Sequence, residues 1–89
     1  MNTILISYRL EQDTDESKIS DRIKRYPNWA RIFNRFWLIK TRTGVRSVRD
    51  ELEYVTQGRG EIFVINVTDT SWASFKLDKG LSEWIHENL

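Results

Sequence analysis

Four basic residues near the middle of the chain have the type and spacing of an anion-binding site. The segment KTRTG at positions 40–44, followed by two further arginines, places Lys40, Arg42, Arg46 and Arg49 around the expected start of a helix. A helix start offers free backbone N–H groups and the positive end of the helix dipole, and Gly44 lets a phosphate approach closely. The spacing therefore predicts one phosphate-binding surface at this helix start.

Two further arginines, Arg31 and Arg35, extend this basic set along the preceding segment. They alternate with Trp29, Phe33 and Trp37, whose flat rings are suited to stacking on nucleic-acid bases. An alternative is that these aromatic residues belong to the core or to a contact between two chains.

The charge of the chain is divided unevenly although its net value is only +1. Residues 1–17 carry a net charge of −3, and residues 50–89 carry −5. Between them, residues 18–49 hold ten basic residues and a single acid, Asp21, for a net charge of +9. This pattern favours contact with a polyanion such as DNA or RNA, and a scattered set of solvated arginines is the alternative.

Several other chemistries lack the residues that they need. The chain has no cysteine and one histidine, His86, which excludes zinc–thiolate sites and thiol catalysis and leaves a Ser-His-Asp arrangement without a recognisable motif. No cofactor is expected. The longest apolar stretches have four or five residues, so we expect no membrane insertion, no export and a cytoplasmic location.

Apolar periodicity predicts the elements that must position these side chains. Apolar residues alternate with polar ones near the N-terminus, as in a strand, and recur every three or four residues after Gly44, as on a helix. Gly58 is suited to a left-handed position after that helix. The predicted elements are a strand over 3–9, a helix that begins at Asp13 with Glu16 and ends at Pro27, a hairpin over 29–41 that turns at Asn34–Arg35 (or one long bent strand), a helix over 45–56, a strand over 61–67 and a C-terminal helix with Leu77, Leu81, Trp84 and Ile85.

The order strand, helix, strand, strand, helix, strand, with a helix added at the end, predicts an α+β fold of the ferredoxin-like βαββαβ type. Such a fold has a four-stranded antiparallel sheet with two helices on one face. At 89 residues, and without an internal repeat or a linker, the chain is predicted to form a single domain over 1–89.

The last strand of the predicted sheet is apolar on both faces. Ile62 and Val64 point to one face, while Phe63, Ile65 and Val67 point to the other. Two helices can cover only one face, so the second must be covered by residues 68–89 or by a second copy of the chain. We expect a homodimer that forms through this sheet face.

Three segments together resemble a known group. They are LISYRL at 5–10, the tryptophan-rich hairpin and EIFVINV at 61–67, and they are similar to the CRISPR-associated small ferredoxin-like nuclease superfamily. That group contains the adaptation-complex subunit and its virulence-associated toxin relatives, and the chain looks most like its stand-alone members. The resemblance implies homodimers paired through their sheets, and paired aspartates that hold a divalent metal for phosphodiester cleavage.

The chain departs from this family at one functional position. Ser7, Tyr8 and Leu10 match the pattern at the end of the first strand, but Arg9 occupies the position of the family aspartate. A guanidinium repels a divalent cation and instead forms bidentate contacts with phosphate. We therefore expect a small homodimeric protein that binds or associates with DNA or RNA, without nuclease activity.

Two other functions remain open on the sequence alone. In the first, the chain is a metal-dependent endonuclease in which Glu11 or Asp13 replaces the missing aspartate. In the second, it is a protein-interaction module of a toxin–antitoxin or mobile-element system. Binding to nucleic acid with and without magnesium distinguishes the three.

Overall fold

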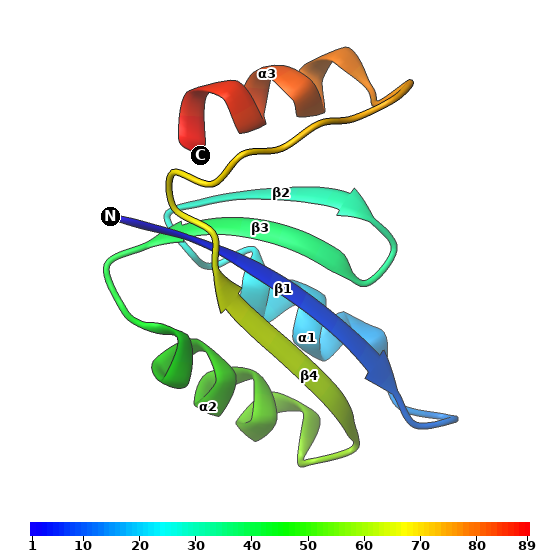
Figure 1. The fold of residues 1–89 in the computed structure, drawn as a ribbon. Coiled ribbons are helices and arrows are strands. Elements are labelled where there is room, and N and C mark those ends of the chain that lie inside the picture. Colours follow the sequence, from blue (N-terminus) through cyan, green and yellow to red (C-terminus); the bar gives the residue numbers. More distant parts are fainter.

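The computed structural model describes all residues from 1 to 89, which form four strands and three helices in the predicted order (Figure 1). The strands are β1 (Asn2–Leu10), β2 (Asn28–Phe33), β3 (Phe36–Thr41) and β4 (Gly60–Asn66), and the helices are α1 (Glu16–Ile23), α2 (Val45–Thr56) and α3 (Lys79–Asn88).

The four strands form one antiparallel sheet in the order β2-β3-β1-β4. Ile6 in β1 lies opposite Trp37 in β3 and Val64 in β4, so these three side chains share the face toward α1 and α2. β4 begins at Gly60, where a Cβ atom would lie 2.5 Å from the Arg9 carbonyl oxygen, so only glycine fits this approach to β1. The topology confirms the predicted ferredoxin-like fold with an added C-terminal helix.

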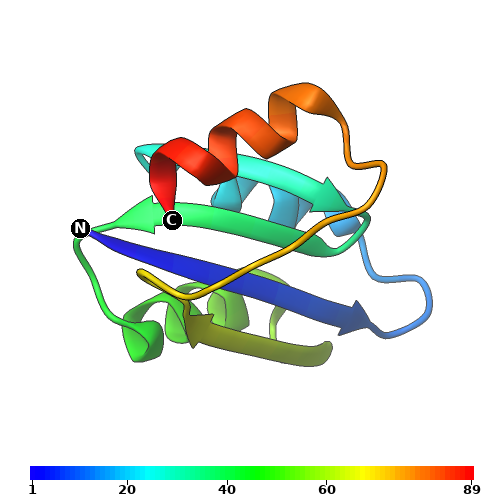
Figure 2. The same cartoon turned by 45° about the horizontal axis from the view of Figure 1, so that its top comes forward.

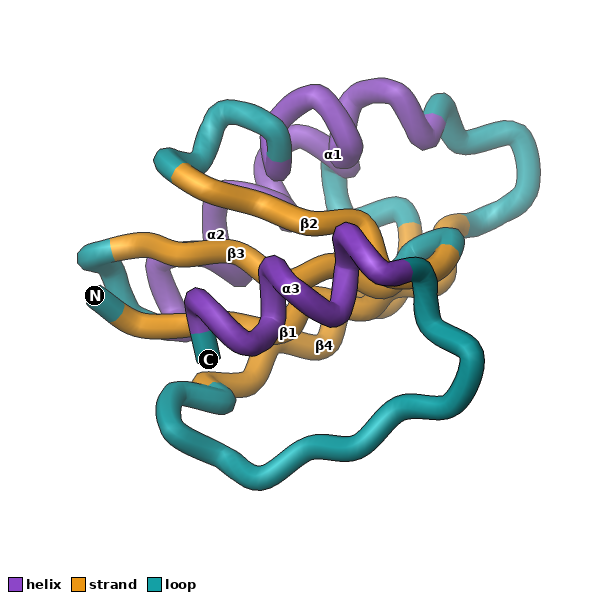
Figure 3. Tube along the Cα trace, turned by 90° about the horizontal axis from the view of Figure 1, so that it is seen from above, coloured by secondary structure: helices purple, strands orange, loops and turns teal.

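The main core lies between α1 and α2 and the sheet face that they cover. Figure 3 shows these two helices on one side of the sheet and α3 on the other. The large side chains in this core that are fully buried come from strands and helices alike: Ile4, Ile6, Trp37, Ile39, Ile19, Ile23, Val48 and Leu52. The helical members recur every three or four residues, which explains why the sequence pattern located both helices.

The opposite face, here called the outer face, is covered in part by the C-terminal segment. α3 lies over the β2–β3 side of the sheet (Figure 2), where the Trp84 indole donates a hydrogen bond to Asn28 over 2.9 Å and Ile85 is buried. Phe63 and Ile65 on β4 remain 61% and 42% exposed. Of the two covers that the sequence allowed for this face, the C-terminal segment is present and covers part of it. An apolar strip along β4 stays open.

Several element boundaries match the sequence prediction, but those of the first helix and the start of the last helix do not. α1 ends at Ile23 rather than at Pro27, and Leu77 lies two residues before α3. α2 spans the predicted residues, and the hairpin turns at Asn34–Arg35 with Arg35 in the left-handed region, so the alternative of one long bent strand is wrong. The prediction that Asp13 begins the first helix is also wrong. Asp15 is the N-cap and accepts a hydrogen bond from the Ser17 amide over 2.9 Å, while Asp13 has a φ of 66° in the turn before it.

The end of α2 shows the predicted glycine conformation. Gly58 has a φ of 72°, and Gln57 before it is also left-handed, with a φ of 56°.

None of the three helices is long and apolar enough to cross a membrane.

Candidate nucleic-acid interface

The basic residues singled out in the sequence occupy three separate places in the fold. Arg35 precedes β3 and Arg42 follows it, and a six-residue strand is about 20 Å long, so the two lie at opposite ends of the sheet. Arg31 lies near Arg35, whereas Arg46 and Arg49 follow Arg42 on α2. The structure does not bring the six predicted side chains together on one surface.

The start of α2 differs from the starts of the other two helices. Asp15 and Asp78 cap α1 and α3 by accepting hydrogen bonds from backbone amides, whereas Gly44 precedes α2 and provides no side-chain cap. No heavy atom lies within 4 Å of the position that a Gly44 Cβ atom would occupy. The first N–H groups of α2 are therefore open to an external acceptor.

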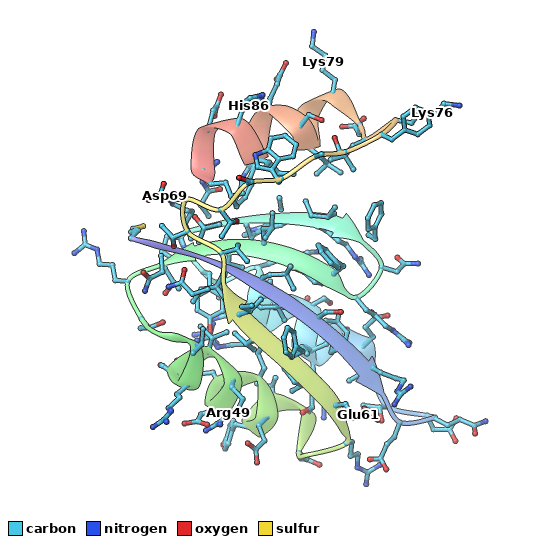
Figure 4. All side chains as sticks on the ribbon, in the orientation of Figure 1. Arg49, Glu61, Asp69, Lys76, Lys79 and His86 are labelled. Atoms are coloured by element: carbon cyan, nitrogen blue, oxygen red, sulfur yellow. The ribbon has the colours of Figure 1, made fainter.

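Three arginines surround this open helix start. Arg42 and Arg46 are exposed and make no ion pair, and Arg49 is paired only with its neighbour Asp50, over 2.9 Å. Figure 4 shows Arg49 extending outward from α2, on the side of the molecule away from α3. The first turn of α2 contains no acidic residue. We call this set, Arg42, Arg46 and Arg49, the α2 arginine cluster.

A shallow hollow lies beside the α2 arginine cluster. Arg46 and Arg49, together with Ile62, Phe63 and Val64 of the edge strand β4, line this hollow of about 200 Å³. Ile62 and Val64 pack against the main core, so the Phe63 side chain, which alternates with them, belongs to the outer face. The hollow therefore brings the edge of β4, and not a stacking ring, next to the two guanidinium groups. The sequence did not connect this edge with the arginines, which lie 14–21 residues earlier.

The other two arginines converge on one carboxylate at the opposite end of β3. Arg31 and Arg35 lie 3.6 and 3.5 Å from the same Glu16 oxygen, which also accepts a hydrogen bond from the Tyr8 hydroxyl over 3.2 Å. The buried Trp37 indole donates to that hydroxyl over 3.3 Å, and the Arg31 guanidinium lies 5.0 Å from the Trp37 ring. We call these five residues the Glu16 network.

Burial and the nearby Glu16 carboxylate determine the ionisation of this network. Burial raises the pKa of Tyr8, and the charge of Glu16 raises it further. Glu16 also offsets part of the charge of Arg31 and Arg35, so these two arginines are less available to an external anion than the α2 arginine cluster.

Lys40 lies apart from both groups of arginines. Its ammonium donates hydrogen bonds to the Asn88 carbonyl oxygen over 2.9 Å and to the Thr3 hydroxyl over 3.2 Å, on the outer face. A cation at this place stabilises the C-terminal end of α3. Because Lys40 is bonded there, it does not point toward the start of α2.

The aromatic residues of the hairpin divide between core and surface. Trp37 is fully buried, as the core alternative predicts. Trp29 packs on it with 5.6 Å between ring centroids but is 38% exposed. Phe33 is 63% exposed but lies at the opposite end of the sheet from Arg42. The core alternative thus holds for one of the three rings.

Arg9, near the end of β1, forms a cross-strand ion pair. Its guanidinium lies 2.6 Å from Glu61 on β4, and this hydrogen bond raises the pKa of Arg9.

Glu11 and Asp13 follow in the turn before α1, where the Glu11 amide donates to the Arg59 carbonyl over 3.2 Å. Nowhere in the structure do three histidine, aspartate or glutamate side chains gather closely enough to hold a metal ion.

The fold and this surface define the class of protein as a ferredoxin-like α+β sandwich with an added C-terminal helix and an uncapped, arginine-rich helix start. No family model, no curated protein and no solved structure matches the chain.

Proposed function

We propose that this protein is a small homodimeric nucleic-acid-binding protein that holds backbone phosphates at the start of α2 and does not cleave them. One observation carries the proposal: α2 has no side-chain cap, and Arg42 and Arg46 beside it have no carboxylate partner. Arginine and a free helix start both bind phosphate oxygens, so their combination at one exposed place favours a phosphate ligand.

The contacts available at this surface go to phosphate. Phosphate contacts do not distinguish one sequence from another. Binding is therefore expected to be weak, almost independent of sequence and steeply weakened by salt.

The homodimer is supported by the strip that the C-terminal segment leaves open. Phe63 and Ile65 are exposed on β4, which is also an edge strand with unpaired backbone groups. Covering such a strip releases about 25 cal/mol for each Å² of apolar surface removed from water. A second copy that packs on β4 would also bring two α2 arginine clusters into one particle.

The resemblance to the CRISPR-associated ferredoxin-like nuclease superfamily is part of this proposal. It rests on LISYRL at 5–10, the tryptophan-rich hairpin and EIFVINV at 61–67. Arg9 replaces the family aspartate and is paired with Glu61. On this view the chain retains the scaffold of the superfamily and binds nucleic acid without cutting it.

The direct test is fluorescence anisotropy with labelled single- and double-stranded DNA and RNA. If one chain contacts three phosphates, the logarithm of the binding constant on duplex DNA should fall by about 2.7 for each tenfold rise in salt. Failure to bind any of the four nucleic acids at low salt would overturn the proposal.

The same titrations in magnesium and manganese test the endonuclease alternative. We expect intact nucleic acid on denaturing gels after incubation with either metal. Metal-dependent cleavage that a chelator stops, and that Glu11→Gln or Asp13→Asn abolishes, would favour the endonuclease instead. Arg9→Asp then asks whether restoring the family carboxylate restores cleavage.

An interaction module is the second candidate, and the exposed apolar strip on β4 favours it. Light scattering measures whether the protein is a monomer or the homodimer of the main proposal. A mass of about twice 10.7 kDa that falls to 10.7 kDa in Phe63→Lys/Ile65→Lys supports the dimer. A stable monomer that binds no nucleic acid would favour the interaction module.

A further inference from the structure

A cavity of about 360 Å³ lies between the outer face of the sheet and the segment that leads from β4 to α3. Its floor includes Leu5, Phe36 and Leu38 of the sheet, and its roof includes Trp72 and Phe75 of the segment 67–78, here called the strap. Figure 3 shows the strap as a long loop that joins the end of β4 to the start of α3. This cavity is separate from the start of α2.

The lining of the cavity is apolar, aromatic and uncharged. Twelve of its fifteen residues are hydrophobic, and the other three are Thr70, Ser71 and Ser74 of the strap. A charged ligand would lose its hydration there without gaining a partner of opposite charge. The ligand that fits is therefore neutral and largely apolar. Thr70, Ser71 and Ser74 are the polar residues of the lining, and their hydroxyls can bond one polar group of that ligand.

The strap is fixed at its ends and free in its middle. At one end the Val67 amide donates to the Thr3 carbonyl over 2.8 Å, and the Thr3 amide donates to the Thr68 hydroxyl over 2.9 Å. At the other end, α3 is held to the sheet by the bond from Trp84 to Asn28. The backbone of residues 71–77 makes no hydrogen bond. The roof can therefore move to admit a ligand while its two ends keep the cavity in place.

The roof also carries apolar surface that a ligand would cover. Phe75 is 86% exposed, and Trp72 is 37% exposed although its ring packs edge-on against His86 at 5.3 Å. Aromatic rings on both floor and roof favour an aromatic ligand, which can make stacked or edge-on contacts with them.

The volume of the cavity limits the size of the ligand. An apolar cavity of about 150 Å³ accommodates one benzene ring, and 360 Å³ therefore has room for roughly two rings. The largest hollow, about 860 Å³ beside Lys18, Asp50 and Tyr54, is more open to solvent and is lined by charged side chains. We propose that the cavity under the strap binds a neutral aromatic molecule of about two rings that carries one hydrogen-bonding group.

Calorimetric titration of the full chain with 2-naphthol and with 2-naphthoate tests this proposal. The two probes have the same rings, but only the second is charged at pH 7. We expect one 2-naphthol for each chain, and binding at least tenfold weaker for 2-naphthoate. Equal affinities, no binding of 2-naphthol up to its solubility, or one molecule for every two chains would overturn the proposal.

A substitution that fills part of the cavity tests whether the probe binds there. Ala73 lines the cavity from the exposed strap, so Ala73→Phe should occupy part of the space without disturbing the main core. We expect it to weaken 2-naphthol at least tenfold. Lys79→Phe, which adds the same ring at an exposed position on α3 outside the cavity, should leave affinity unchanged. Unchanged affinity in Ala73→Phe would overturn the proposal. Anisotropy with DNA should be unaffected by either variant, so this test does not depend on the nucleic-acid proposal.

Discussion

Two groups of arginines lie at opposite ends of β3, and they differ in whether the fold supplies an acidic partner. At the start of α2, Arg42 and Arg46 have no acidic partner, and the helix has no side-chain cap. At the other end, Arg31 and Arg35 share Glu16, which lies in the first turn of a helix capped by Asp15. The same residue type is thus available to an external anion in one region and partly neutralised within the molecule in the other.

This difference shows that the net charge of a segment does not locate a binding surface. Residues 18–49 carry +9, but part of that charge is offset by Glu16 and Glu51, which lie outside the segment. The Arg22–Glu51 ion pair joins α1 to α2, and the Tyr26 hydroxyl donates to the same carboxylate over 2.7 Å. What matters for binding is which cations remain without a partner after folding.

The largest expected effect comes from removing the arginines that have no ion-pair partner. Arg42→Ala/Arg46→Ala should weaken binding to duplex DNA about 100-fold at low salt, because each charge-assisted contact contributes about 1.5 kcal/mol. The salt dependence should flatten by about 1.8 log units. Anisotropy titrations at several salt concentrations measure both quantities.

The matched control for that variant removes the same two charges from the other end of β3. Arg31→Ala/Arg35→Ala should weaken binding by less than about threefold, since these arginines lie at the far end of β3 and Glu16 already offsets part of their charge. If the two double variants weaken binding equally, the contrast between the two regions does not govern function.

The next effect is on stability and belongs to the Glu16 network. Tyr8→Phe removes the acceptor of the buried Trp37 indole and should lower the free energy of unfolding by about 1–3 kcal/mol. Urea denaturation followed by tryptophan fluorescence measures this change. The α2 variant Arg46→Ala should change stability by less than about 0.5 kcal/mol, because it loses no internal contact. A Tyr8→Phe chain as stable as the parent would show that the network adds nothing to folding.

A smaller effect is expected when the shared carboxylate loses its charge. Glu16→Gln keeps an acceptor for Tyr8 but leaves Arg31 and Arg35 without an ionic partner. Affinity for duplex DNA should rise about threefold, with a steeper salt dependence, because two cations become available. An unchanged salt dependence would mean that DNA never reaches this end of β3.

The smallest effect concerns alkaline pH. Burial raises the pKa of Tyr8 and of Tyr26 above the unfolded value of about 10. Stability from both groups is fully present below pH 10 and is lost as pH rises through their folded pKa values, because the unfolded chain releases its tyrosine protons first. Urea denaturation from pH 8 to pH 11 should show the decline, and Tyr8→Phe/Tyr26→Phe should reduce it. A decline of the same size in that variant would assign it to other groups.

Much of the fold could be predicted from local patterns. The alternation along β1 and the three- and four-residue spacing along α2 depend only on which side of an element faces the core, and both were located correctly. The start of α1 was misplaced by two residues, because Asp13 and Asp15 are both good capping residues and the sequence pattern did not distinguish them. The nucleic-acid function and the homodimer remain predictions.

The candidate site was only partly predictable, for a different reason. The sequence pointed to the arginines near Gly44 and to the helix that begins there. It did not indicate that Lys40 would bond to the Asn88 carbonyl oxygen, or that Phe63 of β4 would line a hollow together with Arg46. Both contacts join residues 17 or more positions apart, and no local spacing encodes them.

The sequence by itself determined the order of the elements, the doubly apolar strands and the central block of positive charge, because each depends on neighbouring residues. Only the tertiary structure decided that α3 and the strap lie on the outer face and enclose a cavity there. It also decided that Glu16 pairs with Arg31 and Arg35 while Arg42 and Arg46 have no ionic partner. The physical reason is that ion pairing and enclosure depend on distances in space, which the sheet sets by bringing distant segments together.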